Sequence, residues 1–107
     1  MTEYKTTLKI ENFEDLDQLA DIPHTPGGFT SRGSFPDNPE QRNNCNVIWA
    51  AKALQAYVNV IGRDEIETSI SDLLGDLMHL ADAAGVDFDE LLNKAEWAYG
   101  EELEGED

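Results

Sequence analysis

Apolar residues recur at the helical period of about 3.6 residues along most of this chain, which predicts helices at four places. Asparagine or aspartate at Asn12, Asn38 and Asp87 is typical of a helix start, and Gly62 and Gly85 are typical helix stops. The expected helices cover residues 13 to about 22, 39–61, 65–84 and 88 to about 103. We therefore expect a mainly α fold, a bundle of three to four helices with a short N-terminal strand or arm.

The N-terminal residues 4–10 alternate between two kinds of side chain, with Tyr4, Thr6, Leu8 and Ile10 at every second position. This period of two predicts a half-buried strand. A single strand is marginal without a partner, and a second copy of the chain is the most available one. The alternative is an extended arm that lies on the helices.

A loop separates this N-terminal part from the remaining helices, because all four prolines and three glycines fall within residues 23–39. At this length the loop is either functional or mobile. We expect one domain over residues 1–107. Its parts are an N-terminal strand and short helix (1–22), the Pro/Gly loop (23–39), a helical bundle (40–103) and a frayed acidic tail (104–107).

The helix expected over residues 39–61 is apolar on two faces. One face contains Val47, Ala50, Ala51, Leu54, Tyr57, Val58 and Ile61. The second face is the strip of Trp49, Ala53, Ala56 and Val60. A helix that is apolar nearly all round is buried on more than one side, so we expect the strip to form a homodimer interface with two-fold symmetry. A central helix wrapped by its own chain remains the alternative.

The two C-terminal helices each have one apolar face, which we expect to be buried. In the first it comprises Ile66, Ile70, Leu73, Leu74, Leu77, Leu80, Ala81 and Ala84. In the second it comprises Phe88, Leu91, Leu92, Ala95 and Tyr99. Cys45, the only cysteine, lies among apolar helix positions and is expected to be a buried thiol without a catalytic role.

Charge changes the picture more than any motif does, since 23 acidic residues against 7 basic ones give a net charge of −16. Such a surface repels nucleic acids and acidic membranes, so we expect no direct contact with either. It attracts basic surfaces. We expect a basic protein partner, such as a nucleic-acid-binding protein whose groove this chain occupies as a DNA mimic. Solubility, or adaptation to salt, is the simpler explanation of the acidity.

A cytoplasmic location is expected, because the sequence has no apolar run near the ~20 residues of a membrane-spanning helix and no apolar leader. The residues expected to bind the partner are acidic positions of the last two helices and one tryptophan. They are Asp72, Asp76, Asp82, Glu90 and Trp97. Trp97 lies opposite the apolar face of its helix, so it either anchors a partner or folds back on the N-terminal segment.

Asp72, Asp76 and His79 follow one helical face at successive turns, and Glu65 stands at the start of that helix. Carboxylates with an imidazole are ligands for a divalent metal ion, but such a site needs several ligands that converge in a cavity. A charged, solvated helix face with a surface histidine is the alternative, and we expect no cofactor unless these four residues bind magnesium.

The stretch 71–95, SDLLGDLMHLADAAGVDFDELLNKA, resembles the second half of the MazG-like nucleotide pyrophosphohydrolases. That resemblance implies an all-α oligomer that hydrolyses nucleoside triphosphates with magnesium held by four acidic residues. Asp72 matches one of the four, whereas Ser69 stands in place of a glutamate and residues 46–62 contain no carboxylate. The stretch also looks like small proteins of bacteriophages and mobile elements.

Three functions are therefore open. The favoured one is a non-enzymatic accessory protein of that phage or mobile-element type, which docks on a basic protein as an inhibitor or adaptor. The second is a diverged magnesium-dependent nucleoside triphosphate pyrophosphohydrolase that uses Glu65, Asp72, Asp76 and His79. The third is a structural component of an assembly.

Overall fold

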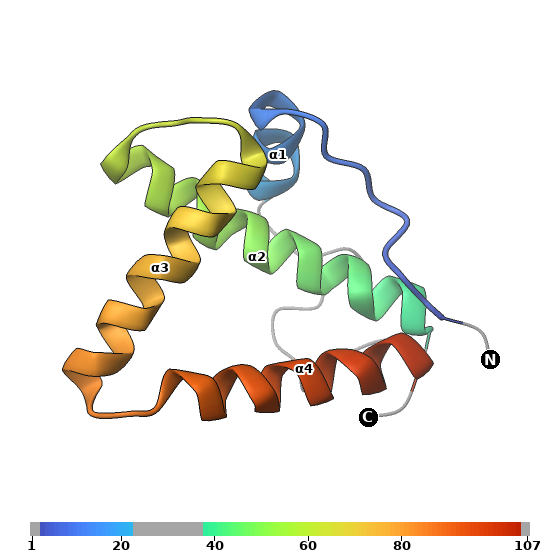
Figure 1. Cartoon of the computed structure of the whole chain (residues 1–107). Helices are drawn as coiled ribbons and strands as arrows, with labels where there is room; N and C mark the ends of the chain where they lie inside the picture. The colour runs from blue at the N-terminus through green and yellow to red at the C-terminus, as the bar shows by residue number, and fades with distance from the viewer. Residues whose placement is uncertain (1–2, 23–37, 106–107) are drawn as a thin grey trace.

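The computed structural model describes residues 3–22 and 38–105. These residues form helices α1 (Phe13–Ala20), α2 (Pro39–Ile61), α3 (Ile66–Ala84) and α4 (Phe88–Glu104). Figure 1 shows α2 crossing the molecule, with α1 near its C-terminal half and the chain of α3 and α4 leading back to its N-terminal end. The expected mainly α bundle is confirmed, and most of the Pro/Gly loop, 23–37, lies outside the described residues.

Local signals account for most helix ends. Asn12 caps α1 by accepting a hydrogen bond from the amide of Asp15, and Asn38 caps α2 by accepting one from Gln41. Asp87 caps α4 in the same way. The stops at Gly62 and Gly85 have φ angles of 102° and 72°, which favour glycine. Helix α1 ends at Ala20, about two residues earlier than expected.

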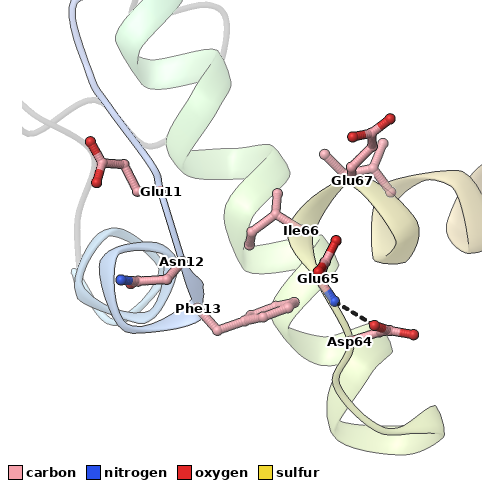
Figure 2. A pocket seen from close by; sticks show the side chains of 8 residues that line it. Glu11, Asn12, Phe13, Asp64, Glu65, Ile66 and Glu67 are labelled. Atoms are coloured by element: carbon pink, nitrogen blue, oxygen red, sulfur yellow. Dashed lines mark hydrogen bonds between the residues drawn. The ribbon is translucent and has the colours of Figure 1, made fainter.

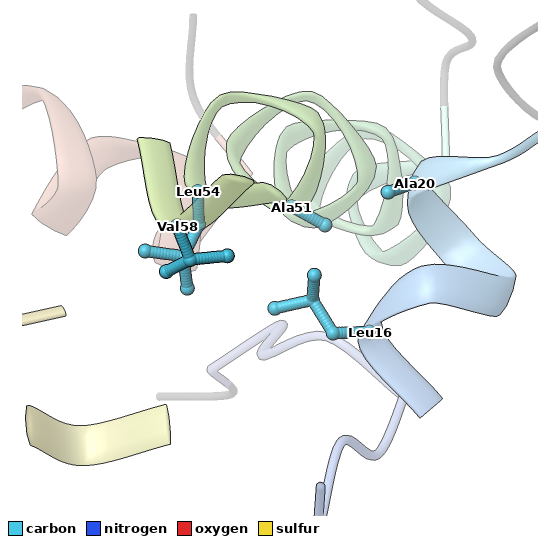
Figure 3. Packing of buried hydrophobic residues seen from close by; sticks show 5 residues of the cluster. All are labelled: Leu16, Ala20, Ala51, Leu54 and Val58. Atoms are coloured by element: carbon cyan, nitrogen blue, oxygen red, sulfur yellow. The ribbon is translucent and has the colours of Figure 1, made fainter. Parts of the chain in front are cut away.

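The largest cluster of buried apolar side chains lies between α1 and α2. Figure 3 shows Leu16 and Ala20 of α1 facing Ala51, Leu54 and Val58 of α2. The half-buried side chains packed against this cluster include those of Phe13, Tyr57, Ile66 and Leu73. The core therefore fixes α1 and the start of α3 on the C-terminal half of α2.

The N-terminal residues 3–10 are an extended arm, and among the described residues no strand is formed. The side-chain amide of Asn43 donates a hydrogen bond to the carbonyl of Tyr4 (2.6 Å), and Asn44 Oδ1 accepts one from the amide of Thr7 (3.0 Å). The amide of Tyr4 also donates to the carbonyl of Leu103 on α4 (2.7 Å), so the arm finds hydrogen-bond partners on both α2 and α4. Within this single chain the segment therefore takes the form of the alternative, an arm that lies on the helices.

The expected burial of the apolar faces of α3 and α4 is wrong for most of their residues. In α3 only Ser69 and Ala81 are buried, and α4 contains no buried residue. The side chains expected in the core but found exposed are Ile70, Leu74, Leu77, Leu80, Ala84, Leu91, Leu92, Ala95 and Tyr99. The reason is geometric: α3 leaves α2 after its first turns, and α4 meets α2 near its own C-terminal end, where Glu102 accepts a hydrogen bond from Asn43.

The two faces expected on α2 are covered unequally. Of the first face, Ala51, Leu54 and Val58 are buried as predicted, whereas Ala50 and Ile61 are exposed. Two buried residues, Ile48 at 1% exposure and Cys45 at 0%, lie on neither predicted face. Burial raises the pKa of the Cys45 thiol, which fits the expected structural role.

The strip predicted as the dimer interface lies at the surface of this single chain. Ala53 and Ala56 are exposed, Val60 is 84% exposed and Trp49 is half-buried. Within the described residues no helix is both long enough and apolar enough to cross a membrane.

Candidate protein-interaction surface

The outer side of α3 presents the acidic residues that the sequence indicated. Asp72, Asp76 and Asp82 are all exposed, and so is His79. No ion pair links these three carboxylates to another residue in the parts of the chain that the structure describes. The negative charges of Asp72 and Asp82 are therefore available to a partner at the surface, whereas Asp76 has a partner within the chain.

Asp76 is the one of these carboxylates that the fold holds in place. Its Oδ2 accepts a hydrogen bond of 2.5 Å from the hydroxyl of Tyr57, which ties α3 to α2. This bond raises the pKa of Tyr57 to about 12, because loss of the phenolic proton would place two negative charges together; burial and the nearby Asp72 act in the same direction. Asp76 is thus an oriented acceptor rather than a free surface charge.

The four residues considered as metal ligands do not come together. Glu65 stands at the N-cap of α3, and the helical rise places it about 20 Å from His79 along the axis. Asp76 is engaged with Tyr57. Among residues 3–22 and 38–105, no group of three or more His, Cys, Asp or Glu side chains is placed to hold a metal ion.

The outer side of α4 carries Trp97, which is 68% exposed. Along the helix, Lys94 precedes it by about one turn, Glu90 precedes it by two, and Glu101 follows it by one, so both signs of charge lie beside the indole. The capping carboxylate of Asp87 accepts hydrogen bonds from the amides of Asp89 (2.9 Å) and Glu90 (3.3 Å), which fixes the start of this helix. An exposed tryptophan can insert its ring into an apolar pocket of a partner protein.

The sequence did not predict a hollow where the N-terminal ends of α1 and α3 come together (Figure 2). Its apolar lining is Phe13, Ile66 and Ile70, and its carboxylates are those of Glu11, Asp64, Glu65 and Glu67. The run of acids at 64–67 is visible in the sequence, but Glu11 joins it only through the packing of α1 against α2.

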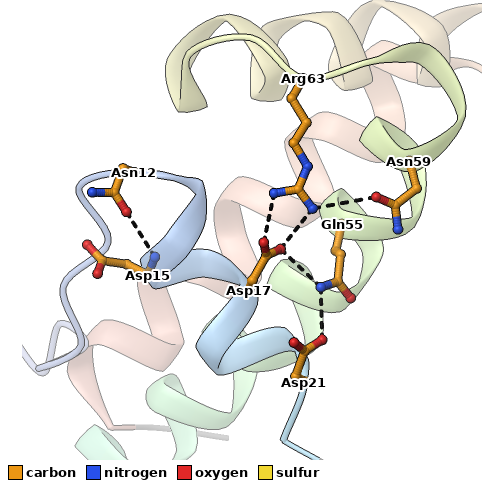
Figure 4. Close-up of polar contacts among 7 residues, drawn as sticks. All are labelled: Asn12, Asp15, Asp17, Asp21, Gln55, Asn59 and Arg63. Carbon is orange, nitrogen blue, oxygen red and sulfur yellow. Dashed lines mark hydrogen bonds and ion pairs between the residues drawn. The ribbon is translucent and has the colours of Figure 1, made fainter.

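Two of the few cations serve the fold rather than the surface. Arg63 binds Asp17 through two hydrogen bonds of 2.8 and 2.9 Å (Figure 4). Its guanidinium also lies 4.9 Å from the centre of the Phe13 ring. The pKa of Asp17 lies below its ordinary value, chiefly because of Arg63 and then because Gln55 also donates to it. Lys52 donates hydrogen bonds to the carbonyls of Ala20 and Ile22.

These contacts use two of the cations to anchor α1. On α3, no ion pair among the described residues compensates Asp72 or Asp82, so this side of the helix stays acidic. Comparison with protein families, with characterised proteins and with solved structures found no match to this chain.

Proposed function

We propose that this chain is a non-enzymatic docking protein that binds a basic protein partner and acts on it as an inhibitor or adaptor. The observation that carries the proposal is Trp97, a large aromatic side chain that is 68% exposed in a chain with a net charge of −16. Tryptophan is enriched among the residues that dominate binding energy at interfaces.

The net charge of the chain and the aromatic ring of Trp97 have separate roles in this proposal. The net charge of −16 attracts a cationic surface and raises the rate of encounter. Trp97 supplies the apolar contact that makes one basic protein preferred over others. The carboxylates that pair with the Lys or Arg side chains of this partner are those of Asp72, Asp76, Asp82 and Glu90. A partner that normally binds nucleic acid fits this description, because its groove is already cationic.

The test is quantitative capture of partners from lysate of the source cell, with the whole chain as bait. We expect a basic protein to be enriched by the wild type and its apparent affinity to fall about 30-fold with Trp97→Ala, the effect of one dominant interface residue. A second bait neutralises the proposed carboxylates with Asp72→Asn, Asp76→Asn, Asp82→Asn and Glu90→Gln.

The matched control removes the same number of charges elsewhere on the exposed surface, through Glu3→Gln, Glu14→Gln, Glu40→Gln and Glu67→Gln. Capture is expected to fall more with the first set than with the control set. It is also expected to fall as salt rises from about 0.1 M to about 1 M, since the screening length shrinks from about 10 Å to about 3 Å.

Two results would contradict the proposal. One is capture that ignores salt and both sets of substitutions. The other is release of pyrophosphate from nucleoside triphosphates with magnesium, at a rate that Asp72→Asn abolishes, which would assign the acidic residues of α3 to catalysis.

A further inference from the structure

A second feature of α3 and α4 is independent of their acidic side. Helical spacing places Ile70, Leu74, Leu77 and Leu80 within about one third of the circumference of α3. On α4, Leu92 and Tyr99 lie in one row and Leu91 lies beside them, so all three fall within about one third of the circumference. These two rows, here called the α3–α4 apolar face, contain no charged residue.

All seven side chains of this face are between 38% and 62% exposed. They are exposed because α2 covers only the ends of the two helices that are remote from the α3–α4 turn. The turn itself is short and packs locally, with Ala81 buried beside it at 5% exposure. The rows are thus patterned like core faces, but within residues 3–22 and 38–105 of one chain no element covers them.

The size of the uncovered surface is informative. With ~200 Å² for a fully exposed large apolar side chain, the face presents roughly 650 Å². Soluble monomers rarely carry an apolar patch above about 600 Å², whereas a stable complex buries about 800 Å² on each partner. Taken together, the two rows therefore approach the area of one side of a protein interface, and a partner that spans both helices would cover them.

We propose that a second copy of this chain covers the α3–α4 apolar face and forms a two-fold symmetric dimer. In a two-fold interface the same patch meets itself, so an uncharged apolar row always meets an uncharged apolar row. A cationic partner gains nothing there, because the carboxylates of Asp72 and Asp82 lie on other sides of α3. The like charges of the two copies stay on the outside, where water and salt screen them.

This inference does not depend on the proposed docking function, and it moves the interface away from the Trp49, Ala53, Ala56 and Val60 strip of α2. Trp97 lies on the side of α4 opposite Leu92 and Tyr99, so the dimer leaves it accessible.

The test measures the mass of the full chain by light scattering and sedimentation between about 1 and about 100 µM, a range that brackets typical weak and strong dimers. The wild type is expected at twice its mass of 11.9 kDa. Leu80→Glu is expected to weaken the dimer by at least about 30-fold, because it places a carboxylate in the interface. Leu80 is 62% exposed within one chain, so the monomer loses few contacts, and circular dichroism checks that it stays helical.

Val60→Glu is the matched control, since it adds the same charge at a side chain that is 84% exposed in the α2 strip. It is expected to leave the dimer intact. Photo-methionine at Met78, which is 50% exposed beside Leu74 and Leu77, gives a reading without a charge substitution: it is expected to cross-link one copy to α3 or α4 of another.

A wild type that remains monomeric over this range would overturn the inference, and so would a dimer that Val60→Glu dissociates and Leu80→Glu does not. A dimer whose Met78 cross-links never reach α3 or α4 of the other copy would also overturn it. None of these results affects partner capture through Trp97, so the two proposals fail separately.

Discussion

Tyr57 joins α2 to α3 through one hydrogen bond to Asp76, and this bond has a titratable consequence. The bond raises the pKa of Tyr57 to about 12 in the folded chain, against about 10 when unfolded. Between these values the folded state holds a proton that the unfolded state releases, so the stabilisation is complete below pH ~10 and is lost as the pH rises towards ~12.

We therefore expect the unfolding free energy of the wild type to fall more steeply over this alkaline range than that of Tyr57→Phe. Urea denaturation at a series of pH values measures it. Asp76→Asn provides the control, because it keeps an acceptor but removes the charge and should bring the pKa of Tyr57 down towards its ordinary value. Equal slopes for the wild type and Tyr57→Phe would show that the bond does not form in solution.

Ile48 is at 1% exposure and has almost no access to solvent. We expect Ile48→Ala to lower the unfolding free energy by about 2–5 kcal/mol, since it removes buried methyl groups and leaves a cavity. Val60→Ala, on the same helix at an 84% exposed position, is expected to change it by less than about 0.5 kcal/mol. Similar effects at the two positions in urea denaturation would contradict the burial seen here.

At the scale of the helices, the ends are set by short-range chemistry. Asp87 accepts two backbone hydrogen bonds at the start of α4, which has no buried residue to hold it. Asp87→Ala is expected to cost about 1 kcal/mol, whereas Asp87→Asn keeps the cap and should cost much less. Urea denaturation gives the free energies, and amide hydrogen exchange shows whether the loss is confined to α4. An equal loss for both variants would assign the effect to charge instead of capping.

The difference between short-range and long-range interactions explains which parts of the structure could be predicted from the sequence. Caps such as Asn12 and Asn38 and stops such as Gly85 act within one helical turn, so the bounds of α2 and α4 follow from neighbouring residues. Which apolar face is covered depends on how far α3 diverges from α2, and no local pattern contains that angle. The expected burial of Leu77 and Leu92 was wrong for this reason.

The candidate site also has features that local sequence predicts and features that it does not. The outward position of Asp72, Asp82 and Trp97 follows from helical periodicity alone, and all three are exposed as that periodicity requires. The bond between Tyr57 and Asp76 joins two helices and was not foreseen. The N-terminal arm shows most clearly what local sequence cannot predict. Its alternation of half-buried and exposed residues follows from the period of two in the sequence. Its hydrogen-bond partners, which include Asn43 and Asn44, lie far along the chain and could not be predicted from that period.

At the scale of the whole molecule, acidity and exposed apolar surface are opposing properties of one small chain. A net charge of −16 keeps copies apart and strains the folded state by self-repulsion. The α3–α4 apolar face draws copies together. Salt strongly weakens the charge repulsion and has little effect on the apolar attraction, so an experiment at several salt concentrations distinguishes the two.

We expect added salt to act in opposite directions on the chain and on its proposed complex. The unfolding free energy should rise, on the order of 1 kcal/mol, between about 0.01 M and about 0.15 M salt, because screening relieves repulsion among the carboxylates. Urea denaturation at one fixed protein concentration measures this, since self-association also contributes to stability. The variant with Glu3→Gln, Glu14→Gln, Glu40→Gln and Glu67→Gln has four fewer negative charges, so its unfolding free energy should respond less to salt. Capture of a basic partner should weaken over the same increase in salt concentration. If the unfolding free energy also falls over this range, repulsion among the carboxylates does not destabilise the fold.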